Sequence, residues 1–212
     1  MIGDKITLSA KYLEPANHIL DLIPMENGFT ICVAGESGSG KSTLAMALQQ
    51  VMEERGLKSM VLHMDDYFIL PPATNHAERE KDINWVGPGE VKLELLQEHI
   101  QQFKMGEKVI HKPLVNYSEN SIGSEDLDLT EVQVLIVEGT YTSLLETDLR
   151  IFINRTYLDT FEDRVKRARD PITPFVESVL AIEHGIISGQ AGQADIIIDK
   201  TFEIMFRNRA DS

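Results

Sequence analysis

Residues 29–44 read FTICVAGESGSGKSTL, and this stretch decides the fold. It begins with an apolar run typical of a buried strand, passes through a glycine-rich turn and ends in residues that favour a helix. Gly35, Gly40, Lys41 and Ser42 have the G-x-x-x-x-G-K-[ST] spacing of a phosphate-binding loop, and the strand before them is the context that this motif requires. The stretch therefore predicts an α/β fold that holds the phosphates of a nucleotide.

Each part of the loop has a physical task. Glycines allow backbone conformations that are closed to other residues, so successive N–H groups can point at a phosphate. The helix that starts near Lys41 adds its positive end. We expect Lys41 to reach the β- and γ-phosphates and the Ser42 hydroxyl to bind the Mg²⁺ that bridges them. The predicted nucleotide contacts are Gly35, Glu36, Ser37, Gly38, Ser39, Gly40, Lys41, Ser42 and Thr43.

Composition limits the size of the protein and its partners. A chain of 212 residues suits one α/β domain, so we predict a single domain over residues 1–212. The net charge of -14 argues against nucleic acid as a partner, because binding a phosphate backbone needs a basic face. The single cysteine, Cys32, is expected in the core and fits a reducing compartment. No signal-like start or run of ~20 apolar residues is present, so a cytoplasmic protein outside the membrane is expected.

Further apolar runs predict strands at 60–63, 132–137, 149–153 and 194–198. Helical patterns at 43–54, 90–103, 160–170 and 175–187 alternate with these strands. A short helix at 17–22 is predicted before the strand that begins at Phe29. The alternation predicts a mainly parallel five-stranded sheet with helices on both faces. In the helix at 90–103, His99 is expected at the surface.

Two segments interrupt this alternation. Residues 71–88 are polar, carry charges of both signs and are predicted to form a loop; a loop of this length is usually functional. Residues 109–117 and 127–132 predict a β-hairpin apart from the main sheet, which makes an appendage at about 109–132. Trp85, within the predicted loop, either lines an acceptor pocket or covers the edge of the core.

Acidic residues follow two of the predicted strands, at the sheet edge where ligands bind in α/β proteins. Asp65 and Asp66 come after the strand at 60–63. Because successive residues of an extended chain face opposite ways, only one of the two is expected to enter a site, unless the pair caps a helix or is solvated. Glu138 follows the strand at 132–137 and is predicted to be the second magnesium anchor, directly or through water.

A basic cluster stands out in this acidic chain. Residues 160–170 read TFEDRVKRARD and contain Arg164, Arg167 and Arg169. Arginines of this kind suit the charge of a transferring phosphoryl group, provided that the segment, at about 157–174, closes as a lid. A solvated helix with surface ion pairs is the alternative.

Phosphate loop, acidic strand ends and arginine-rich segment together are typical of a small-molecule kinase, and the chain resembles the uridine kinase and phosphoribulokinase family of P-loop kinases. The uridine kinase branch is the most similar. The resemblance is carried by GESGSGKST (35–43), MDDYF (64–68), KPLVNY (112–117), VEGTY (137–141), RVKRARD (164–170) and QADIII (193–198). It implies the three-layer P-loop NTPase fold, ATP and Mg²⁺ as cofactors, and phosphorylation of a nucleoside, most simply at the 5'-hydroxyl of uridine or cytidine.

The resemblance also implies roles for individual residues. Asp65 takes the position of the catalytic aspartate, and Tyr117 falls in the acceptor-binding hairpin. Because members of the family are often oligomeric, a homo-oligomer is compatible with the resemblance. The implied catalytic residues are Lys41, Asp65, Arg164, Arg167 and Arg169; the acceptor contacts are Asp65, Tyr67, Phe68, Trp85 and Tyr117; the magnesium anchors are Ser42 and Glu138.

Two departures from the family pattern keep the acceptor open. Residues 84–88 read NWVGP where uridine kinases usually carry Asp-His-Pro, and Asn120 stands where they tend to place a histidine. Another nucleoside, a sugar or sugar phosphate, pantothenate or glycerate therefore remain alternative acceptors. A nucleotide-dependent regulatory protein that signals to a protein partner is the alternative from a different class. An inactive member that only binds nucleotide is a third.

Overall fold

A computed structural model describes residues 8–24, 26–167 and 173–206, and its centre is a six-stranded sheet in the order β2-β5-β1-β6-β7-β8. The strands are β1 (Phe29–Gly35), β2 (Ser59–His63), β5 (Val134–Gly139), β6 (Leu149–Ile153), β7 (Ile196–Ile198) and β8 (Ile204–Phe206). All neighbouring pairs are parallel except β7 and β8. The five predicted strands and the mainly parallel sheet are confirmed, whereas the antiparallel edge strand β8 was not predicted.

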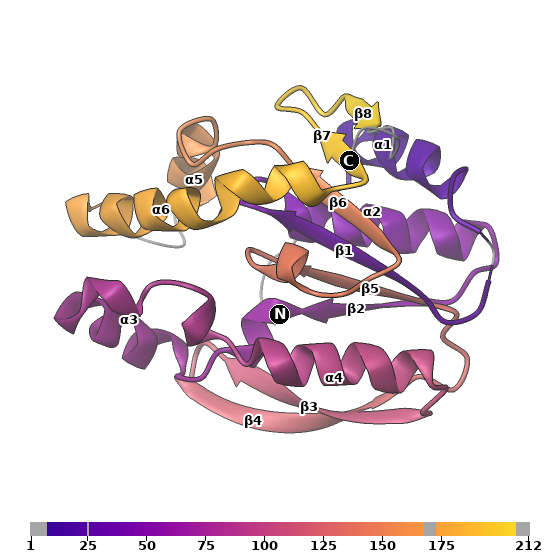
Figure 1. Cartoon of the computed structure of the whole chain (residues 1–212), viewed down its shortest axis with the longest axis horizontal. Helices are drawn as coiled ribbons and strands as arrows, with labels where there is room; N and C mark the ends of the chain where they lie inside the picture. Colours follow the sequence, from indigo (N-terminus) through magenta and orange to yellow (C-terminus); the bar gives the residue numbers. More distant parts are fainter. Residues whose placement is uncertain (1–7, 25, 168–172, 207–212) are drawn as a thin grey trace.

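Helices cover both faces of this sheet (Figure 1), which confirms the three-layer α/β fold. On β5, Val134 and Ile136 pack into the core shared with α1 (Ala10–Leu20) and α2 (Lys41–Glu54). Leu135 and Val137 pack into a second core, shared with α4 (Leu93–Lys104). Strands buried on both faces must be apolar at almost every position, which is why they were readable from sequence. Cys32 is fully buried, as expected.

The segment at 71–88 is not a loop, so that prediction was wrong. It contains the helix α3 (Pro72–Lys81) and two short 3₁₀ helices, η2 (Ile83–Trp85) and η3 (Pro88–Glu90). Pro72 occupies the first turn, where a missing N–H costs nothing. The one fully buried residue of α3 is the polar Asn75, so the helix has no apolar stripe that could have revealed it.

The hairpin exists, but its second strand lies earlier than predicted. β3 (Val109–Asn116) pairs antiparallel with β4 (Ser121–Asp128), apart from the main sheet. The residues of β4 are half-buried or exposed, and most of them are polar; only its last two residues lie within the predicted second strand at 127–132. The strand forms because its backbone pairs with β3 over its full length, a contact that leaves no pattern in hydrophobicity.

The elements that flank the candidate site lie at the carboxyl-terminal edge of the parallel strands. Figure 1 shows α3, α5 (Phe161–Arg167) and the start of α6 (Pro174–Ile187) on that side of the sheet.

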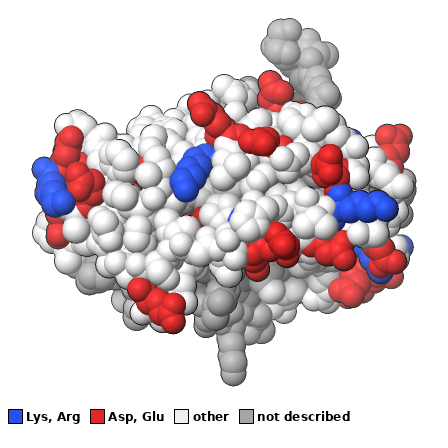
Figure 2. Space-filling model, turned by 90° about the horizontal axis from the view of Figure 1, so that it is seen from below, with Lys and Arg blue, Asp and Glu red and all other residues white. Residues whose placement is uncertain are grey.

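On the face drawn in Figure 2, acidic side chains predominate among the coloured residues and basic ones are scattered. Within the described parts of the chain, no helix has both the length and the apolar character to cross a membrane. The remaining short helices are η1 (Met64–Tyr67), η4 (Thr142–Leu144) and η5 (Ser188–Gln193).

Candidate active site

The phosphate-binding loop joins β1 to α2 and is held by close backbone packing. Gly35 lies so near β6 that a Cβ atom there would be 2.8 Å from the carbonyl oxygen of Ile153. Gly38 has a φ of 79°, in the left-handed region that favours glycine. The Lys41 Nζ donates a hydrogen bond of 2.9 Å to the carbonyl of Glu36, across the loop. The loop thus curls over the first turn of α2, whose positive end faces it.

Ser42 and Glu138 meet at the base of this loop. The Ser42 hydroxyl lies 3.0 Å from Glu138 Oε1, and His63 Nδ1 lies 2.7 Å from the same oxygen. Burial alone would raise the pKa of Glu138, but the bond and charge of His63, the Lys41 charge and the Ser42 hydroxyl hold that pKa below its usual value. An ionised carboxylate next to a hydroxyl is a donor set that suits Mg²⁺. The two predicted anchors are therefore together.

The adjacent aspartates have different surroundings. They lie in η1, so the expected alternation of an extended strand does not apply. Asp66 is buried; it forms an ion pair of 2.8 Å with Lys112 and accepts a hydrogen bond of 3.2 Å from the Val115 N–H. Both partners belong to β3, so Asp66 fastens the hairpin to the sheet. Asp65 is half-buried and lies within electrostatic range of Glu183 in α6.

The aromatic residues predicted to contact an acceptor are spread over several environments. Tyr67 is fully buried, and its hydroxyl lies 2.8 Å from Nδ1 of His99. His99 is buried as well, which corrects the expectation of a surface histidine; burial lowers its pKa. Phe68 and Trp85 are half-buried, and Tyr117 is 37% exposed in the hairpin turn. Tyr67 therefore packs into the second core, and its contact with an acceptor stays a prediction.

One of the three predicted arginines is seen beside the loop. Arg164 lies so close to Gly38 that a Cβ atom there would be 3.0 Å from its Cγ, and its Nη2 donates to the carbonyl of Tyr157 at 2.9 Å. In the same segment, the Thr160 hydroxyl donates to the Ser37 carbonyl at 3.3 Å. Arg167 ends α5, but its side chain, like all of Arg169, lies outside the described residues.

Two residues near the loop, Arg155 and His184, were missed by sequence reasoning. Arg155 is buried and its Nη1 donates to the Ser39 carbonyl at 3.3 Å. His184 Nδ1 lies 2.6 Å from the carboxylate of Glu36, which also accepts a hydrogen bond of 2.6 Å from the Tyr157 N–H. Arg155 follows β6 by two positions, so its place at the carboxyl edge could have been noticed. His184 lies within α6 and gave no signal.

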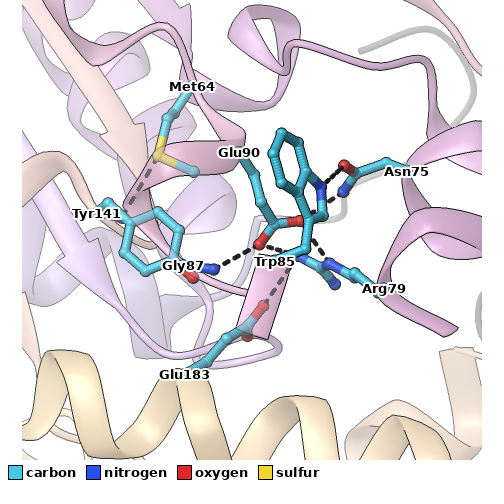
Figure 3. A network of polar contacts seen from close by, with 8 residues as sticks. All are labelled: Met64, Asn75, Arg79, Trp85, Gly87, Glu90, Tyr141 and Glu183. Atoms are coloured by element: carbon cyan, nitrogen blue, oxygen red, sulfur yellow. Dashed lines mark hydrogen bonds and ion pairs between the residues drawn. The ribbon is translucent and has the colours of Figure 1, made fainter. Parts of the chain in front are cut away.

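A polar network joins the helix α3 to α6 (Figure 3). At its centre is Glu90, which is 0% exposed. Arg79 contacts both carboxylate oxygens of Glu90, with Nε at 2.5 Å and Nη2 at 3.0 Å. Asn75 donates to Glu90 at 2.6 Å and accepts from Trp85 Nε1 at 2.8 Å. Arg79 also reaches Glu183 of α6 at 3.4 Å, so the network spans the two elements.

Comparison with known proteins identifies the family. The model of the Phosphoribulokinase / Uridine kinase family matches residues 30–169. The chain belongs to this family. It is 30% identical, over 82% of its length, to the bifunctional alpha-galactosidase/sucrose kinase AgaSK of Mediterraneibacter gnavus, and it spans 20% of that relative. It is 29% identical to the uridine kinase of Ureaplasma parvum, over 71% of this chain and 73% of that protein.

A solved member of the family has the same fold. The phosphoribulokinase from Rhodobacter spheroides superposes with a TM-score of 0.67 at 16% identity, covering 89% of this chain and 83% of that one. The family places the protein among phosphotransferases that use a nucleotide and act on small acceptors.

Proposed function

We propose that the protein is a magnesium-dependent kinase that transfers the γ-phosphoryl group of ATP to a hydroxyl of a small acceptor. The observation that carries the proposal is the convergence of three groups at the carboxyl edge of the sheet. The phosphate-binding loop ends β1, the Ser42–Glu138 pair lies at its base, and Asp65 follows β2, the strand next to β5. Membership of a kinase family supports the same reading.

Each residue has a chemical task in this proposal. Asp65 accepts or orients the proton of the acceptor hydroxyl, which makes its oxygen a better nucleophile. Lys41 and Arg164 stabilise negative charge on the transferring group, and the loop N–H groups hold the phosphates in place. The Ser42 hydroxyl and the Glu138 carboxylate would hold Mg²⁺. When bound, that ion neutralises charge shared by the β- and γ-phosphates.

The first candidate acceptor is a nucleoside, uridine or cytidine, at its 5'-hydroxyl. It is supported by the family and by several relatives that are named uridine kinase. An uncharged carbohydrate is the second candidate, because the relative matched over 82% of this chain is named for sucrose kinase activity. Anionic acceptors, such as the substrates that the names phosphoribulokinase and D-glycerate 3-kinase denote, are the remaining class.

The test is ADP release by the full chain with Mg²⁺-ATP, alone and with each acceptor in turn. A true acceptor should raise the rate by orders of magnitude. Asp65→Asn should remove most of this stimulation, since general base catalysis contributes about 10²- to 10⁴-fold, while binding of a fluorescent ATP analogue stays nearly unchanged. Stimulated turnover that is equal in Asp65→Asn would exclude Asp65 from the mechanism.

A slow basal rate that no small molecule changes would favour the regulatory alternative. In that case a protein partner, and not a hydroxyl compound, should accelerate nucleotide hydrolysis. Lys41→Ala should behave differently from Asp65→Asn. It should weaken ATP binding as well as turnover, because Lys41 is proposed to contact the phosphates directly.

A further inference from the structure

Residues 155–160, between β6 and α5, make hydrogen bonds to the phosphate-binding loop. Three donors of this segment reach three residues of the loop: the Tyr157 N–H reaches Glu36 Oε2 at 2.6 Å, the Thr160 hydroxyl reaches the Ser37 carbonyl at 3.3 Å, and Arg155 Nη1 reaches the Ser39 carbonyl at 3.3 Å. The sheet brings segment and loop together, because β1 and β6 are parallel neighbours and both end at this edge.

Two of the donors are side chains that the fold buries at the loop. Arg155 is 8% exposed, and its Nη2 pairs with Asp163 of α5 at 2.8 Å. Thr160 is 0% exposed, and its hydroxyl proton is shared between the carbonyls of Ser37 and, at 3.4 Å, Tyr157. A buried donor that loses its acceptor cannot turn to water instead, so the fold favours both contacts with the loop.

Fixing a carbonyl also fixes the N–H group that follows it. The C=O of one residue and the N–H of the next belong to one planar trans peptide and point in opposite directions. The held carbonyls of Ser37 and Ser39 therefore direct the Gly38 and Gly40 N–H groups away from residues 155–160. Gly38 and Gly40 have φ values of 79° and 104°. Because glycine has more backbone freedom than other residues, these peptide groups need outside support to keep one orientation.

The loop supplies such support itself at one other position. The Glu36 carbonyl accepts hydrogen bonds from Lys41 Nζ at 2.9 Å and from the Ser39 N–H at 3.1 Å. The peptide groups after Ser37 and Ser39 are instead held by residues 155–160. N–H groups whose orientation is fixed before a phosphate arrives bind it more tightly, because no further ordering is needed on binding.

We infer that Arg155 and Thr160 are positioning residues for nucleotide binding. They hold the carbonyls of Ser39 and Ser37 so that the N–H groups that follow face the nucleotide phosphates. The inference rests on the proposed function, since it needs a nucleotide at the loop, and it adds two residues that the phosphate-loop motif does not contain. In this role neither side chain touches the nucleotide; both act through the backbone of the loop.

The experiment measures the Kd of ATP and of adenosine for the full chain with Mg²⁺, by calorimetry. Thr160→Val keeps the shape of the side chain and loses the hydroxyl, so the Kd of ATP should rise about fivefold. Arg155→Met loses a charged donor, and the rise should be about tenfold. Adenosine has the same base and sugar without phosphates, so its Kd should not change in either variant. Thr160→Ser keeps the hydroxyl and should bind ATP as the wild type does.

Two matched controls remove equivalent groups away from the loop. Thr30→Val deletes another fully buried hydroxyl, which donates to Asp148 at 2.7 Å near the start of β1. Arg55→Met deletes the ion pair with Asp21 at the far end of α2. Both should lower the melting temperature and leave the Kd of ATP unchanged. Once an acceptor is known, Thr160→Val should also raise the KM of ATP without raising that of the acceptor.

An unchanged Kd of ATP in both Thr160→Val and Arg155→Met would overturn the inference and leave the proposed function standing. If Arg155→Met does not fold, Thr160→Val alone decides. A proportionate loss of adenosine binding would overturn the inference too, because the substitutions would then disturb the whole site. If the variants lose ATP affinity as expected but no acceptor stimulates turnover in the wild type, the kinase function fails and the inference stands.

Discussion

Asp65 and Asp66 are neighbours in sequence, but the structure gives them separate tasks. Asp66 stabilises the fold, because it pairs with Lys112 and accepts a hydrogen bond from the Val115 N–H of β3. Asp65 lies where its charge, like that of Lys41, acts on Glu183. Sequence indicated that one of the pair would enter the site, and family resemblance chose Asp65. The structural task of Asp66 depends on Lys112, and this contact is not readable from sequence because the two residues are far apart in the chain.

Replacing Asp66 should therefore test the fold and not the chemistry. Asp66→Asn leaves the buried Lys112 with Glu125, at 2.8 Å, as its remaining carboxylate partner. Because a buried charge loses its better-buried partner, we expect the free energy of unfolding to fall by about 3 kcal/mol. Urea unfolding measures this loss, and turnover per folded molecule should stay near that of the wild type. A stable Asp66→Asn protein without turnover would reverse the assignment of the two aspartates.

Glu183 should make stability depend on pH. Burial raises its pKa from 4.5 to about 7 in the folded state, so between these values the unfolded chain ionises while the folded chain keeps the proton. Stability is therefore lost as pH rises through this window and stays lower above it. The difference in unfolding free energy between Glu183→Gln and the wild type should therefore shift in favour of the variant by about 2 kcal/mol between pH 5 and pH 8. Urea unfolding at both pH values is the measurement, and Glu177→Gln is the control. A stability difference that is the same at both values would contradict the shift.

At the scale of elements, the sequence predicted what is held by apolar contacts and missed what is held by polar ones. The five parallel strands of the main sheet are apolar runs, and they were located within a few residues, whereas the short antiparallel strand β8 was missed. The helix α3 is held by Asn75 and Arg79, which bond to the buried Glu90, and β4 is held by backbone pairing. Neither kind of contact produces hydrophobic periodicity. The polar network around Glu90 was missed for the same reason.

The start of α3 is also tied to the hairpin turn. Asn120 has a φ of 46°, its Oδ1 accepts a hydrogen bond of 2.8 Å from the Ala73 N–H, and its Nδ2 donates to the Thr74 hydroxyl at 3.2 Å. The residue that replaces the family histidine is thus a helix cap supplied from another element, which satisfies an N–H that α3 itself cannot pair. It couples the hairpin to the helix that carries Arg79.

Two substitutions separate the cap from the backbone conformation. Asn120→Gly keeps the left-handed conformation and loses the side-chain bonds, so stability should fall by about 1 kcal/mol. Asn120→Ala loses the same bonds and adds backbone strain, so its loss should be about 2 kcal/mol. Hydrogen exchange should be faster across α3 in both variants and unchanged in α2. Equal exchange rates in α3 would show that the hairpin does not support the helix.

For the whole molecule, the decisive feature is that one loop gathers groups from most of the chain. Glu138 of β5 reaches Ser42, His184 of α6 reaches Glu36, and Arg155, just after β6, reaches the Ser39 carbonyl. A ligand bound at this loop is linked to elements on both sides of β1 in the sheet. Nucleotide binding should therefore stabilise the fold as a unit, and it should do so in two separable parts, one from the phosphates and one from the metal.

Thermal unfolding with ATP, in the presence of Mg²⁺ or EDTA, should separate these parts. At a hundred times Kd, bound Mg²⁺-ATP adds about 2.7 kcal/mol, which for a chain of this size raises Tm by roughly 5–10 °C. Glu138→Gln and Ser42→Ala should reduce the rise to that seen in EDTA, because they remove only the proposed metal anchors. Lys41→Ala should reduce the rise under both conditions, since it is proposed to contact the phosphates themselves. A rise in Glu138→Gln that still depends on Mg²⁺ as in the wild type would remove Glu138 from the metal site and leave Ser42 as its anchor.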